Sequence, residues 1–179
     1  MPTSDLRAAL RERVLVSDGS TGVALEALLR QETGETQLPD GCPDGLTLSR
    51  PHVVNRLHSE YLSAGADIIL TNTFGGSPLS LASYGLGEIA GRLNREAATL
   101  ARAAVNRHGR GWVLGSLGPG SLLPSLGQSS FGELKAAYLV QARNLLAGGV
   151  DGLVVETCQD PLQAMAALSA VREMAPAPG

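Results

Sequence analysis

Aromatic residues and cysteines are scarce in this chain, and each shortage excludes a class of protein. Aromatic residues fill 3% of the 179 positions while glycine occurs 22 times, so the core has to be aliphatic and the turns tight. The two cysteines, Cys42 and Cys158, are too few for a disulfide framework or a four-cysteine zinc site. The formal net charge of −3 comes without a basic run, which argues against a nucleic-acid partner.

Long apolar runs are missing as well. No stretch of about 18 uninterrupted apolar residues occurs, which predicts that the chain has no membrane partner. The N-terminus lacks the basic-then-apolar order of a signal peptide, so we expect a cytoplasmic protein. With 44% hydrophobic and 17% charged residues, the chain has the composition of a single globular domain.

Four short aliphatic runs, each followed by turn-forming residues, predict β-strands. They span residues 14–16, 68–70, 112–114 and 153–155. Continuous apolar runs of this kind are typical of strands that are buried on both faces of a parallel sheet.

Helical patterns separate the predicted strands and follow the last one. The longer patterns cover residues 51–64, 88–107, 131–147 and 161–174. A short helix also follows the first strand, and a loop over about 31–50 comes after it. Ser130 and Glu133 have the spacing of a capping box, which predicts where the helix over 131–147 begins.

Strand and helix alternate four times, which predicts an α/β fold with parallel strands and right-handed crossovers. Two architectures fit this order: an open doubly wound sheet, or four consecutive β/α units of a (β/α)8 TIM barrel. Residues 175–179 are rich in proline and cannot continue a helix, so we expect a linker-like or cut C-terminal end there.

Polar residues follow three of the predicted strands, at the sheet edge where α/β proteins bind ligands. Strand alternation places Asp18, Asn72 and Glu156 on faces that would meet at one mouth of a barrel. Asp18 and Asn72 are equally common in turns and helix caps, and that alternative stays open. Glu156 directly follows Leu-Val-Val, where an unpartnered carboxylate is costly to bury, and this favours a functional role.

The loop Gly19-Ser20-Thr21 precedes a predicted helix, so its backbone N–H groups can bind an anion such as a carboxylate. Glu156 is suited to hold an ammonium group through charge-assisted hydrogen bonds. Backbone donors for a carboxylate and a glutamate for an ammonium together predict an amino acid as the ligand.

Five motifs in order resemble the homocysteine S-methyltransferase family, which includes the homocysteine-binding region of cobalamin-dependent methionine synthase and betaine–homocysteine methyltransferase. The motifs are DGSTG at 18–22, GADIILTNTFGG at 65–76, LASYGL at 81–86, GSLGP at 115–119 and GVDGLVVET at 149–157. The resemblance runs over nearly the whole chain.

This resemblance implies a (β/α)8 barrel in which a zinc ion activates the thiol of homocysteine for methyl transfer. It also implies that Asp18, the 19–21 backbone and Glu156 hold the amino-acid end of homocysteine, with Asn72 at the mouth of the barrel. The family's zinc is held by three cysteines in two motifs of the second half of the barrel, and neither motif occurs here. We therefore assign no metal ligand and no catalytic residue, and the methyl donor stays unknown.

The resemblance predicts that residues 1–174 are the N-terminal half of a homocysteine S-methyltransferase barrel, truncated before its second half. Such a fragment or split subunit is expected to be inactive alone. Its partner would be a complementary half-barrel chain or another copy, joined through exposed sheet edges. The alternative is a non-catalytic half-barrel that binds an amino acid or serves in assembly.

Overall fold

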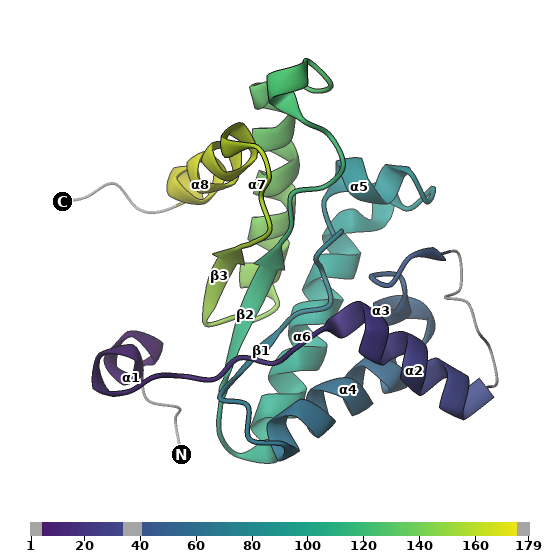
Figure 1. Ribbon diagram of the computed structural model, residues 1–179, viewed down its shortest axis with the longest axis vertical. Helices are drawn as coiled ribbons and strands as arrows, with labels where there is room; N and C mark the ends of the chain where they lie inside the picture. The colour runs from purple at the N-terminus through teal and green to yellow at the C-terminus, as the bar shows by residue number, and fades with distance from the viewer. Residues whose placement is uncertain (1–4, 34–40, 175–179) are drawn as a thin grey trace.

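The computed structural model describes residues 5–33 and 41–174, and a parallel sheet in the order β1–β2–β3 lies at its centre (Figure 1). The strands are β1 (Ile68–Leu70), β2 (Trp112–Leu117) and β3 (Gly152–Val155). The α-helices are α1 (Leu6–Glu12), α2 (Thr21–Thr33), α3 (Leu46–Ser49), α4 (Pro51–Ser63), α5 (Pro78–Ala82), α6 (Ala90–His108), α7 (Phe131–Ala147) and α8 (Pro161–Met174). Two 3-10 turns, Gly87–Ile89 and Pro124–Leu126, precede α6 and α7.

One face of the sheet is covered by α4, α6 and α7, which lie behind the strands in Figure 1. Val113 of β2 packs there against Leu62 and Ala101, and Leu117 packs in a second cluster with Leu145. Because strand side chains alternate, these residues fix the direction of their neighbours. Trp112, Leu114 and Ser116 therefore point to the opposite face.

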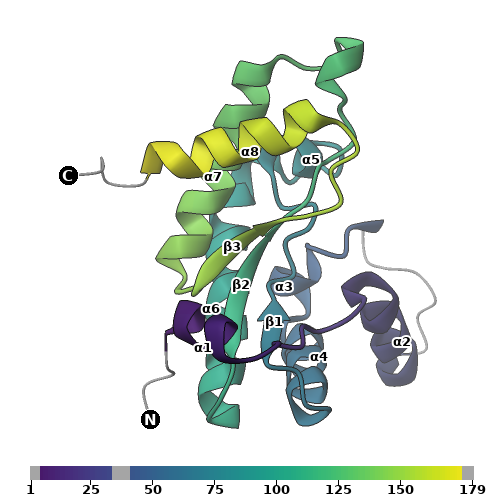
Figure 2. The ribbon, with the colours of Figure 1, turned by 60° about the vertical axis from the view of Figure 1, so that its left-hand side comes forward.

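That opposite face is covered only in part. Helix α1 packs Ala9 against Ile68 and Trp112, near the amino ends of the strands (Figure 2). Toward the carboxyl ends the same face is open, and this is where the cleft described below is found.

The first predicted strand, residues 14–16, is not a strand. The segment runs extended beside β1, with a single parallel bridge between Ser17 and Ile68. Asp18 N donates to Ile68 O at 2.9 Å, but the next ladder position is taken by a side chain, since Leu70 N donates to Asp18 Oδ2 at 2.9 Å. The carboxylate thus replaces the backbone partner and ends the pairing. The fold is mixed α/β with a parallel sheet, and the expected count of four β/α units is not confirmed.

The longer helices agree closely with the sequence patterns. Helices α7 and α8 begin and end where predicted, and Ser130 and Glu133 form the expected capping box at the start of α7. The predicted loop over 31–50 is wrong in part, since α2 continues to Thr33 and α3 lies within it. Residues 34–40 and the predicted linker 175–179 lie outside the described residues. None of the described helices has the length and apolar character that crossing a membrane requires.

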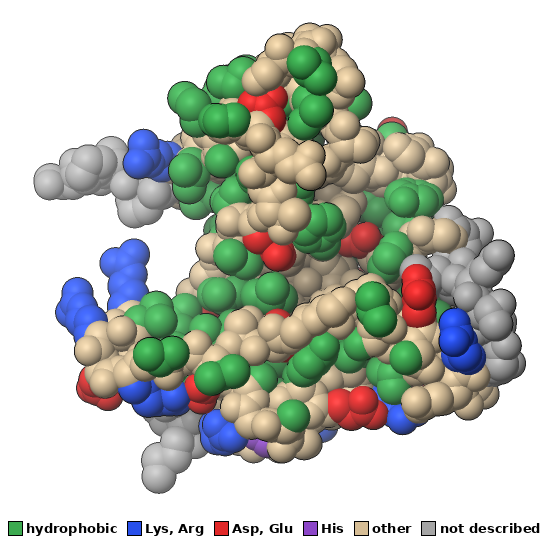
Figure 3. Space-filling view, in the orientation of Figure 1, with side chains coloured by type: hydrophobic (Ala, Val, Ile, Leu, Met, Phe, Trp, Pro, Cys, Tyr) green, Lys and Arg blue, Asp and Glu red, His purple; other side chains and the backbone are tan. Residues whose placement is uncertain are grey.

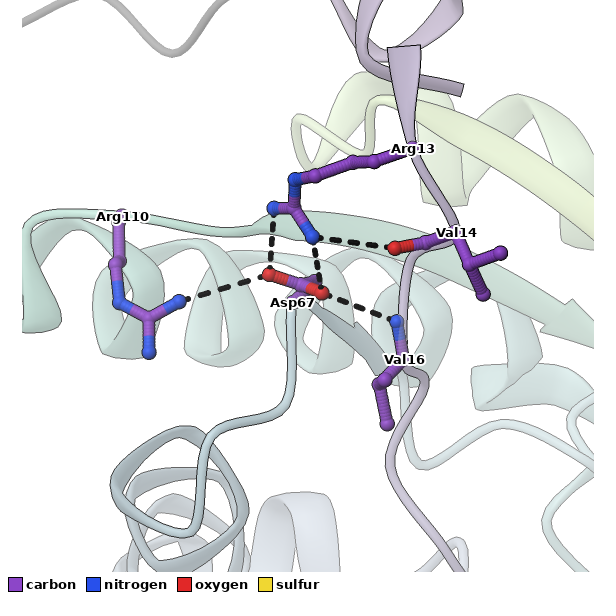
Figure 4. A network of polar contacts seen from close by, with 5 residues as sticks. All are labelled: Arg13, Val14, Val16, Asp67 and Arg110. Carbon is purple, nitrogen blue, oxygen red and sulfur yellow. Dashed lines mark hydrogen bonds and ion pairs between the residues drawn. The ribbon is translucent and has the colours of Figure 1, made fainter. Parts of the chain in front are cut away.

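An ion-pair network fixes the N-terminal segment to the sheet at the amino end of β1 (Figure 4). Both terminal nitrogens of Arg13 donate to the Asp67 carboxylate at 2.8 Å, and Val16 N donates to it at 3.1 Å. Arg110 adds an ion pair at 3.6 Å. These groups hold the pKa of Asp67 well below its usual value, Arg13 contributing most. These contacts with Asp67 fix the position along β1 of the extended segment that leads to Asp18.

Candidate functional site

A cleft of about 720 Å³ opens at the carboxyl ends of the strands. All six residues predicted from the sequence line it: Asp18, Gly19, Ser20, Thr21, Asn72 and Glu156. Further lining residues include Asp44, Phe74, Tyr84 and Ser116. Figure 3 shows acidic side chains around a hollow near the middle of this face.

Asp18 belongs to the end of the extended segment beside β1. Its carboxylate accepts from Leu70 N at 2.9 Å and from Ser17 Oγ at 3.2 Å. The pKa of Asp18 is raised to about 6, mainly by burial and to a smaller extent by the charge of Glu156, while the two hydrogen bonds oppose the shift. Both carboxylates line the same cleft.

Glu156 follows β3 and is held by a hydroxyl group. Ser116 Oγ donates to Glu156 Oε1 at 2.5 Å, and Glu156 N donates to Leu117 O at 3.2 Å. Within residues 5–33 and 41–174, neither Glu156 nor Asp18 forms an ion pair with a Lys, Arg or His side chain. The two acidic groups therefore present uncompensated negative charge to the cleft, which suits a cationic ligand.

Thr157, directly after Glu156, has a strained backbone. Its φ is 59°, and it is the non-glycine residue with positive φ in the part of the chain that the structure describes. A β-branched residue in this left-handed region is unusual and costs free energy. The strain turns the chain sharply at the point where Glu156 enters the cleft.

Asn72 lines the cleft, but its amide nitrogen is engaged elsewhere. Nδ2 donates to Pro43 O at 2.8 Å and to Thr47 Oγ1 at 3.3 Å. The side chain is 4% exposed. Asn72 therefore ties the 43–47 segment to the end of β1, and this contact forms one wall of the cleft.

Asp44 is a cleft residue that the sequence did not reveal. Its side chain is buried, and Oδ1 accepts from Gly75 N at 2.9 Å. Burial raises the pKa of Asp44 to about 6. The residue lies between predicted elements, in a stretch with no strand or helix pattern, so no local signal distinguished it from an exposed loop aspartate.

The loop at 19–21 is supported from behind by Tyr61 of α4. The Tyr61 hydroxyl donates to Ser20 O at 2.9 Å. A Cβ at Gly19 would lie 3.1 Å from the Tyr61 hydroxyl oxygen. Glycine at position 19 therefore allows this close approach. Because α2 begins at Thr21, the N–H of Thr21 is one of the open donors of the helix N-terminus, and the N–H groups of Gly19 and Ser20 directly precede it in the loop that lines the cleft.

Comparison with known proteins decides the family. The model of the homocysteine S-methyltransferase family matches residues 15–178, which is nearly the whole chain. The chain belongs to the homocysteine S-methyltransferase family. This confirms the resemblance found in the sequence motifs.

Two mycobacterial relatives support this assignment. The methionine synthase of Mycobacterium tuberculosis (strain ATCC 25618 / H37Rv) is 37% identical over 174 residues, and that of Mycobacterium leprae (strain TN) is 37% identical over 175 residues. Each match covers 92% of this chain but 14% of the relative. The chain thus corresponds to a small part of these methionine synthases.

Solved structures share the fold. The metallated form of the homocysteine methyltransferase MmuM from Escherichia coli superposes with a TM-score of 0.77 at 23% identity, over 95% of this chain and 63% of that chain. Its oxidized form gives a TM-score of 0.78 over 96% and 63%. The described sheet and helices are therefore consistent with part of a TIM-barrel-like homocysteine methyltransferase fold.

The residues of this family member do not fit a three-cysteine metal centre. The chain has two cysteines; Cys42 is buried against Leu81 and Leu93, and the half-buried Cys158 contacts the backbone oxygen of Glu156 at 3.7 Å. Among the described residues, no group of three or more His, Cys, Asp or Glu side chains could hold a metal ion.

Proposed function

We propose that the cleft binds homocysteine by its amino-acid end and is the substrate-holding part of a homocysteine S-methyltransferase. Asp18 and Glu156 take the ammonium group, and the backbone N–H groups of Gly19, Ser20 and Thr21 take the carboxylate. Family membership supplies the substrate, and the pair of carboxylates without a cationic partner is the observation that carries the assignment.

Each contact follows from ordinary electrostatics. A charge-assisted hydrogen bond is roughly twice as strong as a neutral one, so an ammonium gains most where two carboxylates already lack a counter-ion. The carboxylate of the ligand gains from the start of α2, where open N–H groups and the helix dipole both favour an anion. The cleft thus separates the two charges of an amino acid, and its thiol arm extends into the remaining volume.

The experiment is calorimetric titration of the 179-residue chain with L-homocysteine under reducing conditions and with L-methionine. Glu156→Gln keeps the shape but removes the charge, and we expect it to weaken binding by at least about tenfold. Glu26→Gln, on the exposed surface of α2, is the matched control and is expected to bind as wild type does. Equal affinities for the Glu156→Gln variant and wild type would contradict the proposal.

The finer proposal is that this chain performs methyl transfer only together with further protein that supplies zinc ligands and the methyl donor. It rests on the two-cysteine count and on the 14% share of the methionine synthases that the chain covers. The isolated chain is then expected to form no methionine from homocysteine. Stoichiometric zinc binding that Cys158→Ser abolishes would contradict this.

A cytoplasmic location remains a prediction from the sequence.

A second candidate function is assembly through a sheet edge. Strand β3 is an outer strand of the described sheet, and Met165 and Leu168 of the following helix α8 are half exposed. An outer parallel strand with apolar neighbours favours pairing with another chain. Sedimentation velocity tests this: dimers or larger species are expected, whereas a monomer at all concentrations would contradict the assembly role.

A further inference from the structure

Ser116 lies between the two acidic groups of the cleft. It belongs to the central strand β2, where its side chain shares the face of Trp112 and Leu114 rather than the helix-covered face. Strand β2 pairs with β1 on one side and with β3 on the other; the segment that carries Asp18 lies beside β1, and Glu156 follows β3. The side chain is 2% exposed, yet it lines the cleft.

The position of Ser116 is fixed by its own backbone. Ser116 N donates to Thr71 Oγ1 at 3.0 Å, and Ser116 O accepts from Thr73 Oγ1 at 2.9 Å. The Thr71 and Thr73 hydroxyl oxygens are 2.6 Å apart, and since Thr73 already donates to a carbonyl, Thr71 must be the donor between them. Gln141 from α7 also donates to Ser116 O at 3.2 Å. A closed ring of hydrogen bonds therefore holds this residue.

The same ring determines which hydroxyl is free to bind a ligand. The Thr71 and Thr73 hydroxyl protons are both used within the ring, and both oxygens already accept a hydrogen bond. The Ser116 hydroxyl proton is also used, because an ionised carboxylate such as Glu156 can only accept. The Ser116 oxygen, however, has lone pairs that no described residue uses. It is an acceptor with a fixed position on the wall of the cleft.

Three acceptors thus meet at the strand ends: the Asp18 carboxylate, the Ser116 hydroxyl oxygen and the Glu156 carboxylate. A primary ammonium group has three N–H donors in a tripod, so it can satisfy one acceptor with each.

We propose that Ser116 is the third acceptor for the ligand's primary ammonium group, and that it thereby selects primary amines over N-methylated ones. This inference rests on the proposed function, because it assumes that an amino acid occupies the cleft. Ser116 of β2 thus contributes a third contact with the ammonium group, in addition to the contacts of the Asp18 and Glu156 carboxylates. Each N-methyl group on a ligand removes one donor and leaves one of the three acceptors without a partner.

The test is a cycle of two proteins and two ligands. Wild type and Ser116→Ala are titrated with L-methionine and with N-methyl-L-methionine, the weaker pairs being followed by NMR shifts up to high millimolar ligand. We expect Ser116→Ala to weaken methionine binding about tenfold, which is the usual worth of one hydrogen bond to a charged group. Wild type is expected to prefer methionine over the N-methyl ligand about tenfold, and Ser116→Ala less than about threefold.

The second step of the cycle separates contact from mere support. If Ser116 only stiffened the sheet, its loss would weaken both ligands equally and the preference would stay near tenfold. An unchanged preference, or methionine affinity equal to that of wild type, would overturn the inference. Ser63→Ala, at an exposed serine that ends α4 and does not line the cleft, is the control and is expected to leave both affinities unchanged.

Two further variants keep the interpretation unambiguous. Ser116→Cys preserves the approximate size with a sulfur that is a weak acceptor, so it is expected to reproduce the loss of preference even if the alanine variant is unstable. Glu156→Gln reports on the proposed function itself. If Glu156→Gln binds methionine as wild type does, the proposed function fails; if it binds weakly while Ser116→Ala and Ser116→Cys keep the tenfold preference, only the present inference fails.

Discussion

The two ends of the sheet use carboxylates in opposite ways. At the amino end of β1, Asp67 receives both terminal nitrogens of Arg13, Val16 N and the more distant Arg110, and these partners lower its pKa. At the carboxyl ends, Asp18 and Asp44 accept hydrogen bonds from neutral groups, and burial raises the pKa of each to about 6. Within residues 5–33 and 41–174, arginine side chains form ion pairs with Asp67 at the amino end of the sheet, and none forms one with Asp18 or Asp44 at the carboxyl end.

This difference separates a structural carboxylate from one available for binding. A carboxylate whose pKa is lowered on folding stabilises the folded state at neutral pH, and one whose pKa is raised destabilises it. In the proposed complex, an ammonium group beside Asp18 and Glu156 would offset the free energy that the buried Asp18 carboxylate costs. Strongly perturbed groups without a structural partner are accordingly typical of functional sites.

Replacing the structural carboxylate gives the largest expected change. Asp67→Asn should lower the free energy of unfolding at pH 7 by about 2 kcal/mol, because the Arg13 pair and its backbone contact are weakened together. The half-exposed Arg13 side chain keeps the loss below that of a fully buried pair. Urea denaturation measures it, with Arg110→Gln as the control that should change stability by less than about 0.5 kcal/mol.

The pH dependence of this effect has a definite sign. The pKa of Asp67 is lower in the folded state, so its contribution is present above the ordinary carboxyl value near 4 and is lost as pH falls below it. The stability difference between wild type and Asp67→Asn should therefore shrink between pH 5 and pH 3. The loss is complete only near the low folded-state pKa, so part of the difference remains at pH 3; a difference of the same size at pH 5 and pH 3 would show that packing, not charge, is responsible.

At the cleft end the corresponding replacement should stabilise the protein. Asp44→Asn keeps an acceptor for Gly75 N and removes a buried charge, so we expect a gain of about 1 kcal/mol at pH 8. Since the folded-state pKa of Asp44 is raised to about 6, the wild-type carboxyl costs little below pH 4, and its cost develops between pH 4 and pH 6 and is fully present above pH 6. The gain should accordingly become small at pH 4.

Thermal and urea unfolding of the Asp44→Asn variant at pH 4 and pH 8 measure this change. Asp160→Asn is an informative control, because the pKa of that carboxyl is lowered by the hydrogen bond from Ser125 N and its replacement should destabilise. A loss of stability at pH 8 in the Asp44→Asn variant would contradict the claim that buried carboxylates at the cleft end of the sheet destabilise the folded protein.

Local signals in the sequence explain which parts of the fold were predictable. The capping box of Ser130 and Glu133 and the Asp160–Pro161 pair are short-range features, and the helices that they begin lie where predicted. The strand over 14–16 was predicted wrongly because its pairing depends on a long-range contact, in which the Asp18 carboxylate takes the Leu70 N–H.

The cleft was predictable to the extent that strand ends meet in space. Alternation along the strands predicted that Asp18, Asn72 and Glu156 would lie near one another, and all three line the cleft. Ser116 and Asp44 escaped notice for a physical reason. Ser116 lies in a Gly-Ser-Leu-Gly run and Asp44 in an irregular segment, and neither stretch shows a periodic pattern that marks a buried position. Only tertiary packing buries these two residues.

Relief of backbone strain at Thr157 gives the smallest expected change in the free energy of unfolding. Like the raised pKa values, this strain lies at the cleft end of the sheet. Thr157 holds a φ of 59° next to Glu156, and asparagine tolerates this region better than a β-branched residue does. Thr157→Asn should therefore raise the free energy of unfolding by about 0.5 kcal/mol while methionine affinity stays within about twofold. Thr157→Val retains the branch at Cβ and should give no gain, so equal stabilities of the two variants in urea would show that the left-handed turn stores no strain. A gain confined to Thr157→Asn would instead mean that the chain accepts an unfavourable backbone beside Glu156 at the cleft end of the sheet, as it accepts the buried carboxylates of Asp18 and Asp44 there.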